Sequence, residues 1–125
     1  MKVVKLSKDE IANPLKKIDF RELNRLVIKS REGCTIVPFK EIIFLKSDSN
    51  YSEIHTDDNR QHVASKTLKS MEDKLNHLFV RVHQSYIVNI LHVREYSYSE
   101  GLKLLNNQII PVSNSMKKKV SMIFK

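Results

Sequence analysis

A chain of 125 residues has the size of one ordinary domain and is too short to build two full hydrophobic cores. Its formal net charge of +8 favours a polyanionic partner, either nucleic acid or an anionic membrane surface, although a basic surface can also serve only to keep a protein soluble. The single cysteine excludes an internal disulfide and a cysteine-rich zinc motif, and it agrees with a reducing cytoplasm.

Apolar runs in this chain are short. Runs such as Ile42–Leu45 are far below the roughly 20 residues that a membrane-spanning helix needs. The first residues, Met1–Ser7, also lack the long apolar stretch of a signal peptide. We therefore expect a cytoplasmic protein that does not insert into a membrane.

The start of the chain differs in character from the rest. Ser7 and Glu10 have the spacing of a helix capping box, and a proline soon afterwards interrupts any helix. Asp19 can cap a second short helix over Phe20–Arg25. We interpret residues 1–24 as a linker or a small appended element.

From there onward the pattern predicts mostly short β-strands, because β-branched and aromatic residues recur in short runs between turn residues. The predicted strands are Leu26–Lys29, Cys34–Val37, Ile42–Lys46, Tyr51–Thr56, Arg60–Ser65, Phe79–Val82, Tyr86–Val88, Val93–Tyr98, Leu102–Leu105 and Ile109–Val112. Gly33 stands in the first hairpin turn, where a positive φ suits glycine, and Asn106-Asn107 marks the turn of the last hairpin. The architecture predicted is mainly β.

The hairpin around residues 57–59 allows a register to be predicted. If Asp58-Asn59 is a two-residue loop, opposite charges meet beside the turn, and His55 lies opposite His62. Ile54 then lies opposite Val63, so that apolar side chains meet on the other face of the hairpin.

Two helices interrupt the strands. Thr67 can cap the first, in which Leu68, Met71 and Leu75 fall at i, i+3 and i+7 and form an apolar stripe. Ser113 can cap the last. The apolar face of this last helix consists of Met116, Val120, Ile123 and Phe124.

Nothing in the sequence has the pattern of an active site. A cysteine nucleophile needs a base and an electropositive site, and Cys34, in a predicted strand with no identifiable partner, is interpreted as a small packing residue. Glycine-rich phosphate loops, G-x-S-x-G elbows and H-E-x-x-H helices are absent from the sequence. We therefore expect no enzymatic activity and no cofactor.

Five histidines raise the question of a metal site. His55 and His62 could share an ion across the predicted hairpin, but a stable zinc site usually needs a third or fourth ligand, and only Asp57 or Glu53 is at hand. Two solvent-facing histidines are the favoured interpretation, and no metal is expected.

Basic residues are concentrated at the end of the chain. Residues 113–125 contain Lys117, Lys118, Lys119 and Lys125 and no acid. Lysines near a helix N-terminus are mildly unfavourable because the macrodipole is already positive there, and a bound phosphate would reverse the sign of that effect. A solvated lysine-rich face is an equally good alternative.

A second polar cluster lies within Phe79–Asn89. Arg81, His83, Gln84 and Ser85 follow one another closely between two apolar runs. Their side chains match donor and acceptor groups on phosphates or base edges. A polar turn between two strands is the simpler alternative, and on these residues alone it is favoured over nucleic-acid readout.

At these residues the sequence resembles the LytTR family, the DNA-binding domain of AlgR/AgrA/LytR-type bacterial transcriptional regulators. The family pattern is roughly Phe-x-Arg-x-His-x-Ser-hydrophobic-hydrophobic-Val-Asn, and the matching residues are Phe79, Arg81, His83, Ser85, Val88 and Asn89. Further matching blocks are Ile42–Leu45 with Asn50-Tyr51 and His55, then Thr67-Leu68, then Ile110–Ser113. The resemblance covers about residues 26–124.

The resemblance implies a mainly β domain over residues 25–125, an elongated stack of antiparallel β-sheets with about ten strands and one or two short helices. Such domains bind double-stranded DNA at promoter direct repeats, often as dimers, through sheet-edge loops that enter the major groove. The corresponding loops are Lys46–Tyr51, His83–Ser85 and Ser113–Lys118. The residues carried over as DNA-binding are Lys46, Asn50, Tyr51, Arg81, His83, Gln84, Ser85, Ser113, Asn114, Ser115, Lys117 and Lys118.

Roles within these loops are expected to differ. Arg81 and His83 are expected to hold the backbone or the loop, and Gln84 to read bases. Gln84 and Asn114 stand where the family often has arginine. Because Gln and Asn pair bidentately with adenine whereas Arg favours guanine, we expect a preference for a more A-rich element.

Many family members carry a phosphorylatable receiver domain before the DNA-binding domain, and the first 25 residues are too few to hold one. Two alternatives follow. The chain is part of a longer response regulator of a two-component system, controlled by a sensor kinase, or it is a stand-alone regulator controlled by another partner. A homodimer on DNA is a further expectation from the family.

The function implied is that of a sequence-specific DNA-binding transcriptional regulator, the output domain of a response regulator. An alternative from another class is a basic β-rich protein-interaction module without DNA specificity. RNA binding is a weaker third alternative, because stacking platforms need clustered exposed aromatics. The tyrosines do not form such a group in the sequence: Tyr51, Tyr86, Tyr96 and Tyr98.

Overall fold

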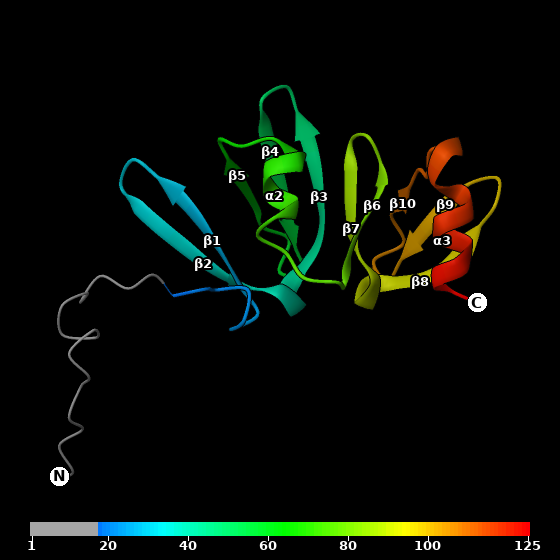
Figure 1. Ribbon diagram of the computed structural model, residues 1–125, viewed down its shortest axis with the longest axis horizontal. Helices are drawn as coiled ribbons and strands as arrows, with labels where there is room; N and C mark the ends of the chain where they lie inside the picture. Colours follow the sequence, from blue (N-terminus) through cyan, green and yellow to red (C-terminus); the bar gives the residue numbers. More distant parts are fainter. Residues whose placement is uncertain (1–17) are drawn as a thin grey trace, which may run out of the picture.

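The computed structural model describes residues 18–125, so the predicted capping box of Ser7 and Glu10 lies outside the described residues. Within them, ten strands form three antiparallel sheets, accompanied by two short α-helices and three 3-10 turns. Figure 1 shows the three sheets following one another along the long axis of the molecule. The predicted elongated stack of antiparallel sheets with short helices is confirmed. No helix in this part of the chain is long and apolar enough to cross a membrane.

The sheets follow the chain in order, with the largest in the middle. The first is the hairpin of β1 (Arg25–Ser30) and β2 (Gly33–Pro38). The central sheet has the order β5-β4-β3-β7-β6 and consists of β3 (Ile42–Asp48), β4 (Tyr51–Thr56), β5 (Gln61–Ala64), β6 (Phe79–His83) and β7 (Tyr86–Asn89). The third has the order β10-β9-β8 and consists of β8 (Val93–Ser97), β9 (Gly101–Leu104) and β10 (Ile109–Ile110). The helices and 3-10 turns are α2 (Leu68–Glu72), α3 (Lys117–Ile123), η1 (Phe39–Glu41), η2 (Ile90–His92) and η3 (Asn114–Met116).

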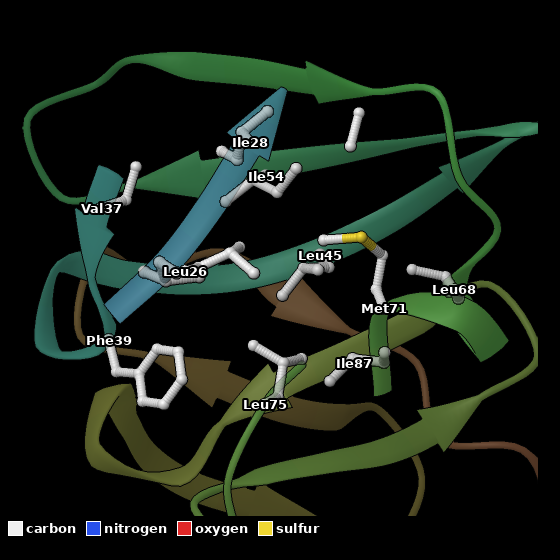
Figure 2. Packing of buried hydrophobic residues seen from close by; sticks show 12 residues of the cluster. Leu26, Ile28, Val37, Phe39, Leu45, Ile54, Leu68, Met71, Leu75 and Ile87 are labelled. Atoms are coloured by element: carbon white, nitrogen blue, oxygen red, sulfur yellow. The ribbon is translucent and has the colours of Figure 1, made fainter. Parts of the chain in front are cut away.

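One hydrophobic core lies between the first hairpin, one face of the central sheet and α2. Figure 2 shows side chains from all three gathered around Met71. The predicted stripe of Leu68, Met71 and Leu75 is buried there, and Thr67 caps the helix by accepting a hydrogen bond from the Ser70 N–H. The cap and the burial of the stripe are therefore confirmed, but the helix is shorter than predicted: α2 ends at Glu72, and Leu75 lies in the bend that follows.

A second core lies between the other face of the central sheet and the third sheet, and α3 covers it. Strand β3 contributes to both cores: Ile42 and Leu45 face the first, whereas Ile43 and Phe44 face the second. A β-bulge between Ile42 and Phe44 lets two consecutive residues share a face. The continuous apolar run Ile42–Leu45 is thus the signature of a strand that is buried on both sides.

The predicted apolar face of the last helix is confirmed only in part. Val120 is buried in the second core, and Met116 packs against it. Ile123 and Phe124 keep exposed fractions of 39% and 42%. Phe124 instead contacts the ring of Tyr96. Tyr96 in turn meets Tyr98 edge to face, and of this pair only Tyr98 is exposed.

Two predictions for the start of the described chain are wrong. Residues 20–24 form a turn rather than a helix, because Asn24 takes a positive φ of 56° that ends the helical hydrogen bonding. Cys34 is exposed rather than packed, because β2 is the outer strand of a two-stranded sheet and turns most of its length to solvent. Gly33, where that strand begins, has φ 151°, as expected for glycine.

The predicted register of the β4–β5 hairpin is wrong by one residue. Ile54 lies opposite His62, and His55 lies opposite Gln61. Thr56 donates its N–H to the carbonyl of Arg60, which leaves a three-residue turn with residue 59 at φ 63°. The buried hydroxyl of Thr56 donates into the turn, and this hydrogen bond stabilises the longer loop.

This register separates the two histidines that were considered for a metal site. His55 stacks on Phe44 with ring centroids 4.3 Å apart and an interplanar angle of 14°, and its Nε2 lies 3.0 Å from Glu53 Oε1. His55 is therefore a packing residue of the sheet rather than a solvent-facing one. Within residues 18–125, no group of three or more His, Cys, Asp or Glu side chains is placed to hold a metal ion.

Asn89, the last residue of β7, is completely buried, and it links the central sheet to η1, the 3-10 turn before β3. Its Nδ2 donates to the carbonyls of Phe39 (3.1 Å) and Ile42 (2.9 Å), and its Oδ1 accepts from the Leu91 N–H (3.0 Å). The side chain thus satisfies three backbone groups at the point where β7 passes into η2.

Replacing this side chain should destabilise the fold. Asn89→Ala leaves buried backbone groups without partners, each costing roughly 1–3 kcal/mol, so we expect the free energy of unfolding to fall by about 3 kcal/mol. Urea denaturation of the full chain measures the change. The exposed Asn114→Ala should cost less than about 0.5 kcal/mol. Equal losses in the two variants would contradict the assigned role.

The β4–β5 turn should contribute to stability in a way that depends on pH. The hydrogen bond from Thr56 holds the pKa of Asp58 below its ordinary value, with help from the backbone N–H and the charge of Arg60. The stabilisation this carboxylate provides is therefore present above the unfolded pKa and is lost as the pH falls through the lower, folded pKa. NMR titration should show the low pKa in Thr56→Ser, which keeps the hydroxyl, and a raised one in Thr56→Val. Identical Asp58 titrations in both variants would refute this cause.

Candidate nucleic-acid interface

Antiparallel pairing brings the turns of the central sheet to one end of its strands. We use the word edge for such a row of turns, and not for the outer strands β5 and β6. Strand β3 ends where β4 begins, and Lys46 of β3 lies opposite Tyr86, the first residue of β7. The β3–β4 and β6–β7 turns therefore lie on the same edge, as the upper part of Figure 1 shows, with the start of α3 beside them. We name this the loop edge and define it by residues 46–51, 83–85 and 113–118.

Two backbone hydrogen bonds join the three segments of the loop edge. Ser47 donates its N–H to the carbonyl of Ser85 (3.0 Å), which ties the first turn to the second. Ser113 donates its N–H to the carbonyl of Val82 (2.9 Å), which ties the third segment to the end of β6. The three predicted loops thus form one connected surface, although they come from distant parts of the sequence.

Arg81 acts as a clamp beneath the β6–β7 turn. Its Nε donates to the carbonyl of His83 (3.0 Å) and its Nη2 to the carbonyl of Gln84 (2.6 Å). Its Nη1 donates to Glu72 Oε1 on α2 at 3.1 Å, which anchors the guanidinium from the opposite side. All three guanidinium nitrogens are engaged within the protein, so Arg81 holds the turn in shape.

His83 stabilises the same turn from within. Its Nδ1 accepts a hydrogen bond from the Ser85 N–H (3.0 Å), and its ring meets Tyr86 edge to face at 5.8 Å between centroids. Because Nδ1 acts as an acceptor, the neutral ring carries its proton on Nε2. The Gln84 side chain, at the tip of the turn, is exposed. The motif thus separates into residues that shape the turn and one that projects from it.

The third segment is a 3-10 turn that leads into α3. Ser113 precedes η3 and makes no side-chain cap bond; its hydroxyl lies 3.3 Å from that of Ser115. The prediction that Ser113 caps the final helix is therefore wrong, because the 3-10 turn intervenes between Ser113 and α3. Asn114, Ser115 and Lys118 are exposed, and Lys117 is half-buried.

The first segment presents the β3–β4 turn. Ser49 has φ 54°, which closes the turn tightly, and Asn50 is exposed beside it. Tyr51, at the start of β4, keeps an exposed fraction of 49%. Lys46 is exposed but lies directly opposite Glu53, so a cross-strand acid partly balances its charge.

Two residues at this edge were not predicted from the sequence. Glu72 holds Arg81, and no sequence signal links a helix residue to a strand residue nine positions away. Lys66 lies in the connection from β5 to α2, which ends at the same edge because Ala64 of β5 pairs with Ser52 of β4. The register of the β4–β5 hairpin could have revealed this placement.

The two edges of the central sheet differ in charge. On and beside the loop edge most exposed charges are positive: Lys46, Lys66, Lys118 and Lys119, against the acids Asp48 and Glu72, of which Glu72 is paired with Arg81. The opposite edge mixes both signs: Lys40, Glu41, Asp57, Asp58 and Arg60. A polyanion would therefore be attracted to the loop edge.

Removing the hydrogen bonds of Arg81 should loosen the β6–β7 turn by an amount that can be measured. Arg81→Met keeps the stem but loses the hydrogen bonds to the turn, so the β6–β7 turn should open more often. Losing about 1.4 kcal/mol would raise the exchange rate of the Ser47 amide, whose acceptor is in that turn, about tenfold. Hydrogen exchange by NMR measures the rate, and Arg94→Met, an exposed arginine on β8, is the control. Unchanged exchange at Ser47 would contradict the clamp.

Comparison with known proteins agrees with this geometry. The family model of the LytTr DNA-binding domain matches residues 32–125. The sensory transduction protein LytT of Bacillus subtilis (strain 168) is 28% identical over 102 residues, which are 78% of this chain and 42% of that protein, so the chain spans less than half of the relative. A solved LytTr DNA-binding domain from Bacillus cereus shares the fold, with a TM-score of 0.68 and 23% identity over 81% of this chain and 96% of that one. The chain belongs to the LytTr DNA-binding domain family.

Proposed function

We propose that this chain binds double-stranded DNA sequence-specifically through the loop edge, as the output module of a transcriptional regulator. The observation that carries the proposal is the convergence of three sequence-distant segments on one edge of a rigid sheet where most exposed charges are positive, in a chain of a DNA-binding family. The role is binding rather than catalysis.

The shape of the loop edge suits a groove of duplex DNA. The β3–β4 and β6–β7 turns are each the tip of a two-stranded hairpin, and the major groove, roughly 12 Å wide, admits a two-stranded β-ribbon. Neighbouring strands lie about 4.8 Å apart, so a hairpin tip with its side chains fills this width. Loops that are already shaped lose little conformational entropy on binding.

Within this edge, contacts to bases and to the backbone fall to different residues. Gln84 and Asn114 are exposed at the tips of their segments and are assigned to base edges, with a preference for adenine. Lys117 and Lys118, with Asn50, Tyr51, Ser85 and Ser115, are assigned to phosphates and sugars. Arg81 and His83 act by shaping the turn that carries Gln84.

The biological setting is proposed from the family. The chain would act in the cytoplasm on promoter direct repeats, with two copies bound side by side. In a longer response regulator, a receiver domain addressed by a sensor kinase would control it; in a stand-alone regulator, another partner would. The relative LytT is described as a sensory transduction protein, which supports the first arrangement.

Selection from a random duplex library, followed by gel shifts at two salt concentrations, tests the proposed function. We expect an enriched element whose complex survives the higher salt, while binding to scrambled duplex is lost. Recovery of no consensus, with equal binding to all duplexes, would instead identify a basic module without DNA specificity.

Two variants should separate base readout from backbone contact. Lys117→Ala should weaken binding to the selected and scrambled duplexes by the same factor and reduce the log–log salt slope by about 0.9. Gln84→Ala should weaken binding to the selected duplex alone, by about 1–3 kcal/mol, and relax the preference at one position. Fluorescence anisotropy measures both. Equal losses on both duplexes for Gln84→Ala would contradict base readout.

A further inference from the structure

A fourth segment reaches the loop edge beside the β3–β4 turn. Strand β5 runs antiparallel to β4 and ends at Ala64, opposite Ser52. The chain then passes through residues 65–67 before α2 begins at Leu68. Figure 1 shows this connection at the same upper edge as the other turns. The sheet order places it at the outer end of the row, beyond β4.

Strand pairing holds the start of this segment, and hydrogen bonds hold its middle and its end. Ser52, completely buried, donates its hydroxyl to the carbonyl of Lys66 at 2.6 Å. Thr67 caps α2 through the Ser70 N–H, which fixes the exit of the segment. The backbone of Lys66 is therefore held against the strand that carries Tyr51, while its side chain is exposed.

We infer that Lys66 contacts a phosphate of bound DNA and extends the interface beyond the three loops of the family resemblance. Its backbone is bound by Ser52, so the ammonium group starts from a fixed point and loses less freedom on binding than one on a mobile loop. None of the ion pairs among the described residues uses Lys66. The charge is therefore available to an external anion.

The position of Lys66 in the row fits this role. Sheet order β5-β4-β3-β7-β6 places the β5 end four strand spacings, roughly 19 Å, from the end of β6. Duplex DNA carries one negative charge per roughly 1.7 Å of axis, so an edge of this length faces phosphates throughout. Lys66 and the lysines of α3 then lie near opposite ends, with the turns that carry Asn50 and Gln84 between them.

The inference rests on the proposed function, and its test distinguishes the two. The chain carrying Lys66→Met, which keeps the apolar stem, is compared with Lys40→Met, which removes the same charge from the opposite edge. We expect the log–log salt slope of binding to fall by about 0.9 in Lys66→Met, on selected and scrambled duplexes alike, and to stay unchanged in Lys40→Met. Lys66→Arg should restore the slope, because a phosphate contact requires only a placed cation.

Phosphate ethylation interference locates the contact directly. Wild-type protein should show interference at one outer phosphate of the footprint that disappears in Lys66→Met and stays in Lys40→Met. Ser52→Ala, which keeps the lysine but releases its carbonyl, should weaken interference at that same phosphate, and thermal melting confirms that the variant is folded.

Failure of the proposed function and failure of the role of Lys66 give different results. If wild-type chain selects no DNA element, the proposed function fails. If wild-type chain binds its element, but Lys66→Met keeps the wild-type slope and footprint, the proposed function stands and the role of Lys66 is refuted. An equal fall of slope in Lys66→Met and Lys40→Met would show an effect of net charge and would also refute it.

Discussion

Strands β3 and β7 of the central sheet are buried on both faces, and this constraint organises the molecule. The first hairpin and α2 cover one face, and the third sheet and α3 cover these strands on the other. Exposed turn residues lie at the two edges where the strands turn. At one edge the buried side chain of Asn89 donates hydrogen bonds to two backbone carbonyls, and the charged residues there are of both signs. The opposite edge, where most exposed charges are positive, is the proposed interface, and the sheet supplies the rigidity that short turns lack on their own.

The polar residues of the family motif serve two purposes. Arg81 and His83 use their hydrogen-bonding groups on the turn itself, and Asn89 uses its own on the backbone at the other end of the same strand pair. These residues determine where the turn lies and how stiff it is. Gln84, at the tip of the turn, is the one that projects. A shared scaffold can therefore present different side chains at the tip without changing the shape of the turn.

Much of the architecture was predictable because it depends on local pattern. The strands, the turn at Asn106-Asn107 and the Leu68, Met71, Leu75 stripe follow from residue type and spacing over a few positions. The errors arose where a tertiary contact overrides local preference. A buried Thr56 hydroxyl selects a three-residue turn and shifts a register, and the outer position of β2 leaves Cys34 in solvent.

Residue pattern alone predicted most of the strands, the family motif and the three segments that form the candidate interface. That these segments share one edge, that Glu72 holds Arg81 and that Lys66 lies beside them became visible only in the folded molecule. The physical reason is that strand pairing and side-chain hydrogen bonds connect residues far apart in the chain. Residue spacing indicates contacts between residues that are only a few positions apart in the chain. The geometry of a binding edge depends instead on the register in which whole strands pair with one another.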